Sequence, residues 1–547
     1  MDLRSGCDNV PRSFHKISMT KLSRAFCSIV LLLSLIATAV SADKPKPKLL
    51  LAVVVDQFRY DYLTRFRADY HGGIARMLER GAVYTDAHYL HFPTVTAIGH
   101  STFMSGALPS VSGIVGNDWY ERDNKQHKPG QVTSVSDPDT KLVGGGPDLP
   151  GSSPRRLLVS TLPDELKMAK RSGKAIGISM KDRSAILPVG HMADAAYWFD
   201  ADSSNFVTST YYMDKLPSWV KQFNDTRPAF KYAGKPWTAV DAKPGDKPFC
   251  SMTAGAELRF CGAIEFTPFS NEMLEEMAEK AIENEQLGTH DGTDVLAISF
   301  SANDYVGHQL GPDAPEVRDI SIRTDQTLKK LLDFLDARLG EGNTLVVFTA
   351  DHGVAPVPEV NAARKMPGGR LNSSSLSRII SDGLSTKFGK GNWFVYDSGG
   401  FLYLNYKTVA DNNADPVEVR RYAAEFARNL PHIGRVFNRD DMLRGGDAAD
   451  PVGRAGLYGF YGSRSGDLVL LPEPYYMFSD SGTTHFAPYN YDTHVPLIFY
   501  GAGIRPGVHH QPAAVNDVAA TLAAFLQVET PSGCSGKILA DALEGLP

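Results

Sequence analysis

Aspartate and histidine side chains that could bind metal ions follow three apolar runs of the sequence, residues 49–55, 295–300 and 345–349. Carboxylate oxygen and imidazole nitrogen are the donors that a catalytic Zn²⁺ site uses while it keeps one position open for substrate. Two such ions, close together, stabilise both the attacking and the leaving oxygen in a displacement at phosphorus. The candidate ligands form two groups of three and predict phosphoryl chemistry: Asp56, Asp304, His308, Asp351, His352 and His485.

Each of these residues also has an ordinary structural explanation. An aspartate at the end of a strand commonly caps the next helix, and a single histidine is more often a satisfied core residue than a ligand. The metal interpretation therefore depends on the residues taken together, at strand ends and with Gly353 next to His352.

The apolar runs indicate how these ligands are positioned. An unbroken apolar run is typical of a strand buried on both faces of a parallel sheet, and ligands bind beyond the carboxyl ends of such strands. Helical patterns lie near residues 60–80, 271–285, 316–339 and 515–526. We expect an α/β fold with a mainly parallel sheet and the chemistry along one edge.

Length and composition favour one large domain. The chain has 547 residues, 43% hydrophobic and 22% charged, which is a soluble globular profile. Widely spaced strands suit one catalytic domain over residues 43–547. Two stretches predict inserted cap segments, at about 197–260 and 356–474.

The amino terminus has the pattern of a secretory signal. Lys21 and Arg24 precede an apolar stretch at 28–40 that ends in Ala-Val-Ser-Ala42. A membrane anchor is the alternative, but the stretch is shorter than the roughly 20 apolar residues needed to span a bilayer. We expect residues 1–42 to be cleaved as a signal peptide, leaving an exported protein, periplasmic or secreted, without a stable membrane anchor.

The net charge argues against binding of duplex nucleic acid. It is −6 for the whole chain, and the predicted signal carries five Lys and Arg against two Asp, so the mature chain is more acidic. Nucleic-acid binding normally requires a basic face. Small anionic substrates must therefore be met by local positive charge.

Cysteine spacing predicts one disulfide. In an exported protein, the nearby pair Cys250 and Cys261 is more typical of a disulfide that closes a short loop than of a metal site. Cys534 has no partner left and is expected to be a buried free thiol.

A hydroxyl nucleophile is available in the segment HFPTVTAIGHSTFMSG, which places Thr94 and Thr96 just before an expected helix start. Free backbone N–H groups and the helix dipole favour a phosphate there, and a metal can activate a hydroxyl without a general base. Thr96 is therefore a candidate nucleophile, with a helix N-cap as the alternative explanation.

The motifs together resemble the alkaline phosphatase superfamily, most closely its secreted phosphate-irrepressible, PafA-like alkaline phosphatases. The resemblance covers about residues 50–503 through VDQFRYDYL, FPTVTAIGHSTFMSG, GIVGNDWY, SMKDR, SANDYVGHQLGP, TADHG and YDTHVPLIFYG. It implies a three-layer α/β/α sandwich with inserted cap segments. It also implies a zinc-dependent hydrolase.

The resemblance assigns roles to individual residues. Thr96 is the residue phosphorylated in turnover, and Asn117 is a ligand of a phosphoryl oxygen. One Zn²⁺ is held by the first ligand group, which Thr96 also contacts, and a second Zn²⁺ by the other. The first group is Asp56, Asp351 and His352; the second is Asp304, His308 and His485.

Lys181 and Arg183 bear on the choice of substrate. A phosphate monoester carries nearly two negative charges, which a Lys and an Arg can neutralise in the transition state. The related nucleotide pyrophosphatase/phosphodiesterase branch characteristically lacks this Lys-x-Arg pair. The pair favours monoesters, and two solvated surface cations are the alternative.

The sequence differs from members of this superfamily in two ways that bear on the site. Their last zinc histidine usually precedes a glycine, whereas His485 precedes Phe486, and His494 is close enough to be a rival. Sulfatases of the superfamily need a modified Cys or Ser that Thr96 cannot replace. The remaining histidines without a partner pattern are interpreted as structural: His88, His91, His100 and His191.

The sequence thus predicts an exported, zinc-dependent alkaline phosphatase that is a monomer and hydrolyses small phosphate monoesters through a phosphothreonine. A phosphodiesterase or nucleotide pyrophosphatase of the same superfamily is the first alternative. A non-catalytic metal- or phosphate-binding protein is the second.

Overall fold

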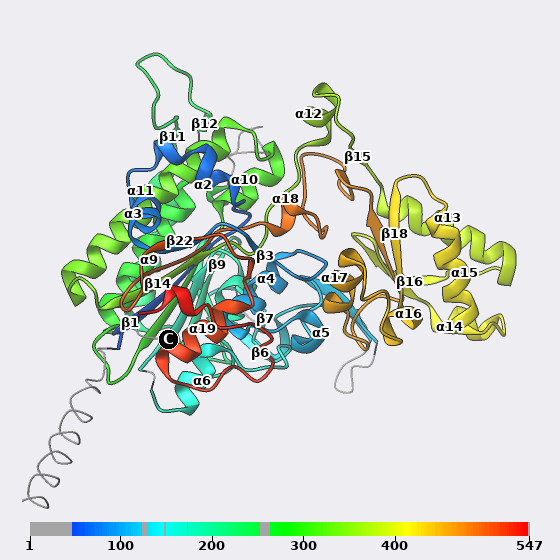
Figure 1. Ribbon diagram of the computed structural model, residues 1–547, viewed down its shortest axis with the longest axis horizontal. Coiled ribbons are helices and arrows are strands. Elements are labelled where there is room, and N and C mark those ends of the chain that lie inside the picture. The colour runs from blue at the N-terminus through cyan, green and yellow to red at the C-terminus, as the bar shows by residue number, and fades with distance from the viewer. Residues whose placement is uncertain (1–45, 123–128, 147–148, 172, 252–262, 545–547) are drawn as a thin grey trace, which may run out of the picture. The chain divides into compact units, whose positions relative to one another are not determined.

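The computed structural model describes residues 46–122, 129–146, 149–171, 173–251 and 263–544 (Figure 1). The predicted signal peptide, residues 1–42, lies outside this part of the chain. Cys261 does too, so its pairing with Cys250 stays a prediction. Cys534 is a free thiol, as predicted, but it is partly exposed rather than buried. None of the described helices is long and apolar enough to cross a membrane.

The apolar runs form the centre of the sheet. Strand β1 (Leu49–Val55) lies between β13 (Asp294–Phe300) and β14 (Thr344–Thr349), and both pairings are parallel. Every residue of the three strands is buried. Strands β8 (Ala175–Ser179) and β9 (Ala195–Asp200) extend the parallel order beside β13. The expected ligand edge therefore exists, because the carboxyl ends of these strands lie together.

The flanks of the sheet are largely antiparallel. Within the described residues, 11 strands follow the order β22-β2-β21-β14-β1-β13-β8-β9-β10-β6-β7. Strands β21 and β2 run antiparallel to their inner neighbours on one side, and β10, β6 and β7 do so on the other. The sheet is thus mixed, with a parallel centre that carries the site. The outer strands are β2 (Ala82–Tyr84), β6 (Ser136–Val143), β7 (Pro150–Ser152), β10 (Asn205–Ser209), β21 (Leu497–Gly501) and β22 (Gly507–His509).

Helices cover both faces of the sheet, which confirms the α/β/α sandwich (Figure 1). One layer contains helices that pack on one another: α3 (Gly73–Arg80), α9 (Phe269–Asn284) and α11 (Pro315–Leu339). The other contains α4 (Thr96–Ser105), α6 (Leu162–Met168) and α19 (Asp517–Leu526).

The helix expected at 60–80 is broken in the structure. It consists of α2 (Asp61–Arg65), a 3-10 turn at Arg67–Asp69 and α3. The cause is Asp325 of α11, whose carboxylate accepts hydrogen bonds from the backbone N–H groups of His71, Gly72, Ile74 and Ala75. A distant carboxylate therefore starts α3, because it satisfies the free N–H groups of the first turn.

The predicted insertion at 356–474 builds a second, smaller sheet. Its antiparallel strands are β16 (Phe394–Ser398), β17 (Phe401–Leu404), β19 (Leu468–Pro472) and β18 (Ile433–Asn438). Helices α13 (Ser373–Phe388) and α15 (Pro416–Arg428) pack on it around a separate apolar cluster. The other predicted insertion, 197–260, begins inside the main sheet, since β9 and β10 belong to it.

Shorter elements connect these layers. The helices are α5 (Pro109–Ser112), α7 (Asp182–Ile186), α8 (Ser218–Asp225), α10 (Ala302–Leu310), α12 (Pro358–Ala363), α14 (Tyr406–Asp411), α16 (Arg439–Leu443), α17 (Pro451–Gly459) and α18 (Asn490–Thr493). The strands are β3 (Ala87–His88), β4 (Asp118–Glu121), β5 (Gly130–Thr133), β11 (Pro236–Trp237), β12 (Cys250–Ser251), β15 (Gly369–Arg370), β20 (Tyr476–Met477) and β23 (Ala513–Ala514).

Buried His91 makes the fold sensitive to acid. Burial lowers the pKa of His91 from 6.5 to about 4, and its Nε2 has no hydrogen-bond partner among the described residues. The unfolded chain therefore takes up a proton first, and the free energy of unfolding falls as the pH drops from about 6.5 towards about 4. Between about pH 7.5 and about pH 5, we expect the wild type to lose about 2 kcal/mol more than His91→Asn. Chemical denaturation of both proteins at both pH values tests this, and equal losses would contradict it.

Candidate active site

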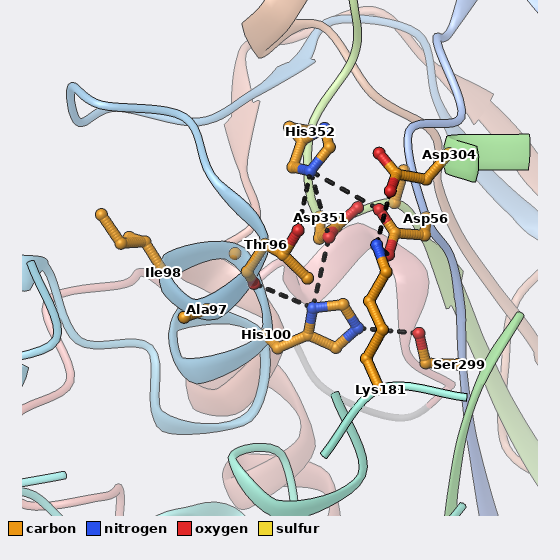
Figure 2. A network of polar contacts seen from close by, with 12 residues as sticks. Asp56, Thr96, Ala97, Ile98, His100, Lys181, Ser299, Asp304, Asp351 and His352 are labelled. Carbon is orange, nitrogen blue, oxygen red and sulfur yellow. Dashed lines mark hydrogen bonds and ion pairs between the residues drawn. The ribbon is translucent and has the colours of Figure 1, made fainter. Parts of the chain in front are cut away.

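The first ligand group lies where β1 and β14 end. Asp56 and Asp351 follow these paired strands, so both carboxylates lie at one edge of the sheet. His352 joins them, with its Nε2 at 3.5 Å from Asp56 Oδ1 and 3.3 Å from Asp351 Oδ2. The three side chains are buried, and their donor atoms lie within 4.8 Å of one another (Figure 2). The structure brings together the residues predicted for one metal.

The second ligand group surrounds Asp304, in the first turn of α10. Its Oδ1 lies 3.1 Å from His308 Nε2 and 3.8 Å from His485 Nε2. A compact buried set is formed by Asp304, His485 and also His352. His352 therefore lies between the two groups, while His308 contacts Asp304 without belonging to that compact set.

Backbone carbonyls orient the three imidazoles. The Nδ1 atoms of His308, His352 and His485 lie 2.8, 3.0 and 2.7 Å from the carbonyl oxygens of Thr483, Gly353 and Thr94, respectively. Because a carbonyl only accepts, each Nδ1 carries a proton, and in the neutral form of the ring Nε2 keeps the lone pair that binds a metal. Burial lowers the pKa of both His352 and His485, which favours the neutral form that binds metal.

The donors fit divalent metal ions. Burial raises the pKa of Asp56, and the neighbouring carboxylates of Asp304 and Asp351 raise it further. Asp56 Oδ1 and Asp351 Oδ2 are buried and accept no hydrogen bond among the described residues. Buried carboxylate oxygens need a hydrogen bond or a cation. Two ligand groups that share this excess of negative charge provide the donors and the charge that Zn²⁺ prefers.

Lys181 supplies one positive charge inside the cluster. Its Nζ lies 2.6 Å from Asp56 Oδ2 and 2.5 Å from Asp304 Oδ2 (Figure 2). Burial by itself lowers the pKa of Lys181, but the carboxylates of Asp304 and Asp56 raise it above its usual value. The amine is therefore charged. Lys181 therefore bridges the two ligand groups.

Arg183, the other half of the predicted pair, is placed differently. It lies in α7, and its Nη1 is 3.8 Å from Asp182 Oδ1. Within the described chain it makes no ion pair with the carboxylates of the ligand groups, and its buried Nε has no hydrogen-bond partner. Of the Lys-x-Arg pair, Lys181 thus contacts the ligand groups, whereas Arg183 pairs with Asp182 instead.

Thr96 is the first residue of α4 and faces the first ligand group. Its Oγ1 lies 3.4 Å from His352 Nε2, and the side chain is buried. The residue at the N-cap position is Val95, not Thr96, and Thr96 makes no capping hydrogen bond. The alternative explanation of Thr96 as a helix cap is therefore wrong.

Asn117 is held beside Thr96 by the same helix. Its Oδ1 accepts a hydrogen bond of 2.8 Å from the backbone N–H of Ala97. Because this bond occupies the oxygen, the side-chain NH₂ is the group left to donate to another ligand. The amide is thus oriented by α4.

A pocket of about 300 Å³ opens in front of the cluster. Asn117, His308 and His485 form part of its wall. The second sheet and the chain that follows it supply aromatic side chains on the other walls: Phe401, Tyr476, Phe478, Phe486 and Tyr491. The insertion at 356–474 therefore helps to shape the space next to the ligand groups.

Sequence reasoning missed Gln57 and the contact that His100 makes with Asp351. Gln57 donates from its backbone N–H to Asp351 Oδ1 and from Nε2 to Asp304 Oδ1, so it links both ligand groups. His100 is fully buried, with Nδ1 at 3.3 Å from Asp351 Oδ2 and Nε2 at 2.8 Å from Ser299 Oγ (Figure 2). His100 was interpreted as structural, and the structure adds that it contacts a candidate ligand. Its position one helical turn after Thr96 was the available signal.

His494, the rival of His485, lies outside both ligand groups. Its Nε2 bonds to the carbonyl of Thr85 at 3.0 Å, and its ring stacks on Tyr60 and His88. The geometry favours His485 as the last ligand of the cluster.

An α/β/α fold whose sheet edge gathers two such ligand groups is typical of metal-dependent phosphoric ester hydrolases. Comparison with known proteins agrees. The family model for type I phosphodiesterase / nucleotide pyrophosphatase matches residues 50–495. The chain belongs to this family and is a phosphoric ester hydrolase. The alternative of a non-catalytic binding protein is thereby not supported.

Individual relatives confirm the resemblance to PafA-like enzymes. The chain is 34% identical to alkaline phosphatase PafA of Elizabethkingia meningoseptica, over 91% of this chain and 95% of that protein. It is 35% identical to alkaline phosphatase PhoV of Synechococcus elongatus, over 91% and 93%. The crystal structure of wild-type PafA superimposes with a TM-score of 0.84 at 33% identity, over 91% of this chain and 99% of that chain.

Proposed function

We propose that the protein is an exported alkaline phosphatase that hydrolyses small phosphate monoesters through a phosphothreonine at Thr96, with two Zn²⁺ ions as cofactors. The observation that carries the proposal is the position of the Thr96 hydroxyl at the start of α4, 3.4 Å from His352 Nε2. Residues 1–42 would direct export, and the enzyme would act as a monomer.

Two residue groups would hold the metals. Asp56, Asp351, His352 and Thr96 would hold one ion, and a second group, Asp304, His308 and His485, would hold the other. Bound Zn²⁺ would supply Lewis-acid stabilisation of the attacking and leaving oxygens.

Thr96 would perform covalent catalysis. Its Oγ forms a bond to phosphorus, the P–O bond to the alcohol breaks, and the alcohol leaves with a proton. Water then attacks the phosphothreonine, which releases inorganic phosphate and restores the hydroxyl. Thr96 is the first residue of α4, so the positive end of the helix dipole lies beside it and favours the negative charge of the phosphoryl group.

Asn117 and the two cations would hold the remaining phosphoryl oxygens. The Asn117 amide is already oriented by Ala97 N–H, so its NH₂ can donate to an oxygen without a conformational cost. The charged amine of Lys181 lies between the two ligand groups. Arg183, two residues further along the chain, has an Nε without a hydrogen-bond partner among the described residues. Two cations favour the doubly charged monoester over a singly charged diester.

The second candidate function is phosphodiester or pyrophosphate hydrolysis. It is favoured by the family model that the chain matches, which is named for those activities. The aromatic pocket has room for a second ester group.

Initial rates on p-nitrophenyl phosphate and bis-p-nitrophenyl phosphate distinguish the two functions. We expect the wild type to prefer the monoester. Lys181→Ala/Arg183→Ala should lower the monoester rate by about 10²–10³-fold, because charge stabilisation in the transition state is lost. Lys174→Ala is the control, since it removes a lysine paired with Glu285 at the opposite end of β8. A diester preference that is indifferent to the double substitution would replace the proposal by the second function.

A further inference from the structure

A third group of metal-binding side chains lies outside the active site, and we call it the peripheral cluster: Asp86, His88 and His494. Its donor atoms lie within 4.8 Å of one another. His88 Nε2 is 3.0 Å from Asp86 Oδ1, and the His88 and His494 rings stack with centroids 4.5 Å apart. A backbone bridge between His88 and His494 fixes the two residues side by side.

Both histidines have their second nitrogen occupied by protein oxygen. His494 Nε2 donates to the carbonyl of Thr85 at 3.0 Å, which leaves Nδ1 with a lone pair. His88 Nδ1 lies 3.1 Å from Thr493 Oγ1, so Nε2 faces Asp86. Metal-binding histidines characteristically have such a partner on the other ring nitrogen, because it fixes the tautomer and the direction of the ring. Burial and His88 lower the pKa of His494, which favours its neutral form.

We propose that Asp86, His88 and His494 form a peripheral site for a borderline divalent ion such as Zn²⁺. Two imidazoles and one carboxylate suit this ion and leave a position for water. Neighbouring ligands of a tetrahedral Zn²⁺ lie about 3.3 Å apart, and the 3.0 Å between His88 and Asp86 needs little change to reach that spacing. The site is open to ions from solution, since the Asp86 side chain is 45% exposed.

The bound ion would cross-link two segments that are distant in the sequence. Asp86 and His88 belong to the region of β3, whereas His494 ends α18. The α18 region also supports the active-site loops, because Asp492 O accepts from Gly353 N and Asp492 Oδ2 accepts from Phe486 N. The expected consequence of ion binding is greater thermal stability, with no direct part in the reaction.

Zinc binding to the holoenzyme tests the proposal. Wild type and His88→Ala are loaded with Zn²⁺ and dialysed against micromolar free Zn²⁺, and bound zinc is measured by mass spectrometry. We expect the wild type to hold one zinc per chain more than His88→Ala, whose affinity at this site should be weaker by at least about tenfold. Once the two active-site ions are bound, further Zn²⁺ should raise the Tm of the wild type, and His88→Ala should lack this further rise.

Two further variants keep the test decisive. Asp86→Asn preserves the shape of the side chain and should also lose the additional zinc, so a folding defect in His88→Ala does not decide the result. The matched control is His432→Ala, because His432 also pairs with a carboxylate, Glu473, at 3.0 Å and stacks on Tyr476, but belongs to no three-residue set in the described chain. Equal zinc contents in the wild type, His88→Ala and Asp86→Asn would overturn the proposal.

Discussion

Thr96→Ala should lower kcat for p-nitrophenyl phosphate by at least about 10³-fold, because the attacking oxygen is removed and the covalent route is lost. The fold should tolerate this change. Thr96 does not cap α4, since Val95 occupies the N-cap position. Metal content should also stay largely unchanged, because His352 and the two aspartates of the first group remain. Steady-state rates, zinc content and a thermal melt are the measurements.

Thr96→Ser is the matched control for this experiment. It keeps an oxygen at the same position and should retain much more activity than Thr96→Ala. Acid quenching during turnover should trap phosphate on Thr96 in the wild type, where peptide mass spectrometry can locate it. An unchanged rate in Thr96→Ala, or trapped phosphate on another residue, would show that Thr96 is not the nucleophile.

His485→Ala should remove one tightly bound zinc ion and lower the rate by more than about 100-fold. His485 Nε2 faces Asp304 Oδ1, and its Nδ1 is fixed by the carbonyl of Thr94, so the imidazole is held in the direction of the second ligand group. The zinc that remains after dialysis against a competing chelator gives the number of tightly bound ions. The rate on the monoester is measured in parallel.

His494→Ala is the direct comparison, because sequence reasoning left both histidines as candidates. It should keep both tightly bound ions and most of the activity, since His494 lies with Asp86 and His88 instead of Asp304. The competing chelator removes zinc from the weaker peripheral cluster in the wild type and in both variants. The measured zinc therefore reports on the active-site ions alone. Loss of activity and of a tightly bound ion in His494→Ala, with neither loss in His485→Ala, would exchange the assignments.

The sequence by itself was sufficient for the fold class and for most of the site. Runs such as 49–55 are apolar without interruption, which is typical of a strand buried on both faces of a parallel sheet. Parallel pairing in register then brings the residues that follow these strands to one edge. Asp56 and Asp351 could therefore be placed together without coordinates, because their positions depend on local strand periodicity and one general rule of α/β sheets.

Only the tertiary structure decided which side chains face one another across long sequence separations. Lys181 forms ion pairs with Asp56 and Asp304. The sequence around Lys181 could not show whether its amine contacts these carboxylates or the substrate. Gln57 joins both ligand groups, and Asp325 starts α3 from another helix. His485 and His494 are near in sequence, yet their rings lie in different clusters. The physical reason is that short-range periodicity determines which face of an element is buried, whereas the partners of a buried charge depend on how distant elements pack.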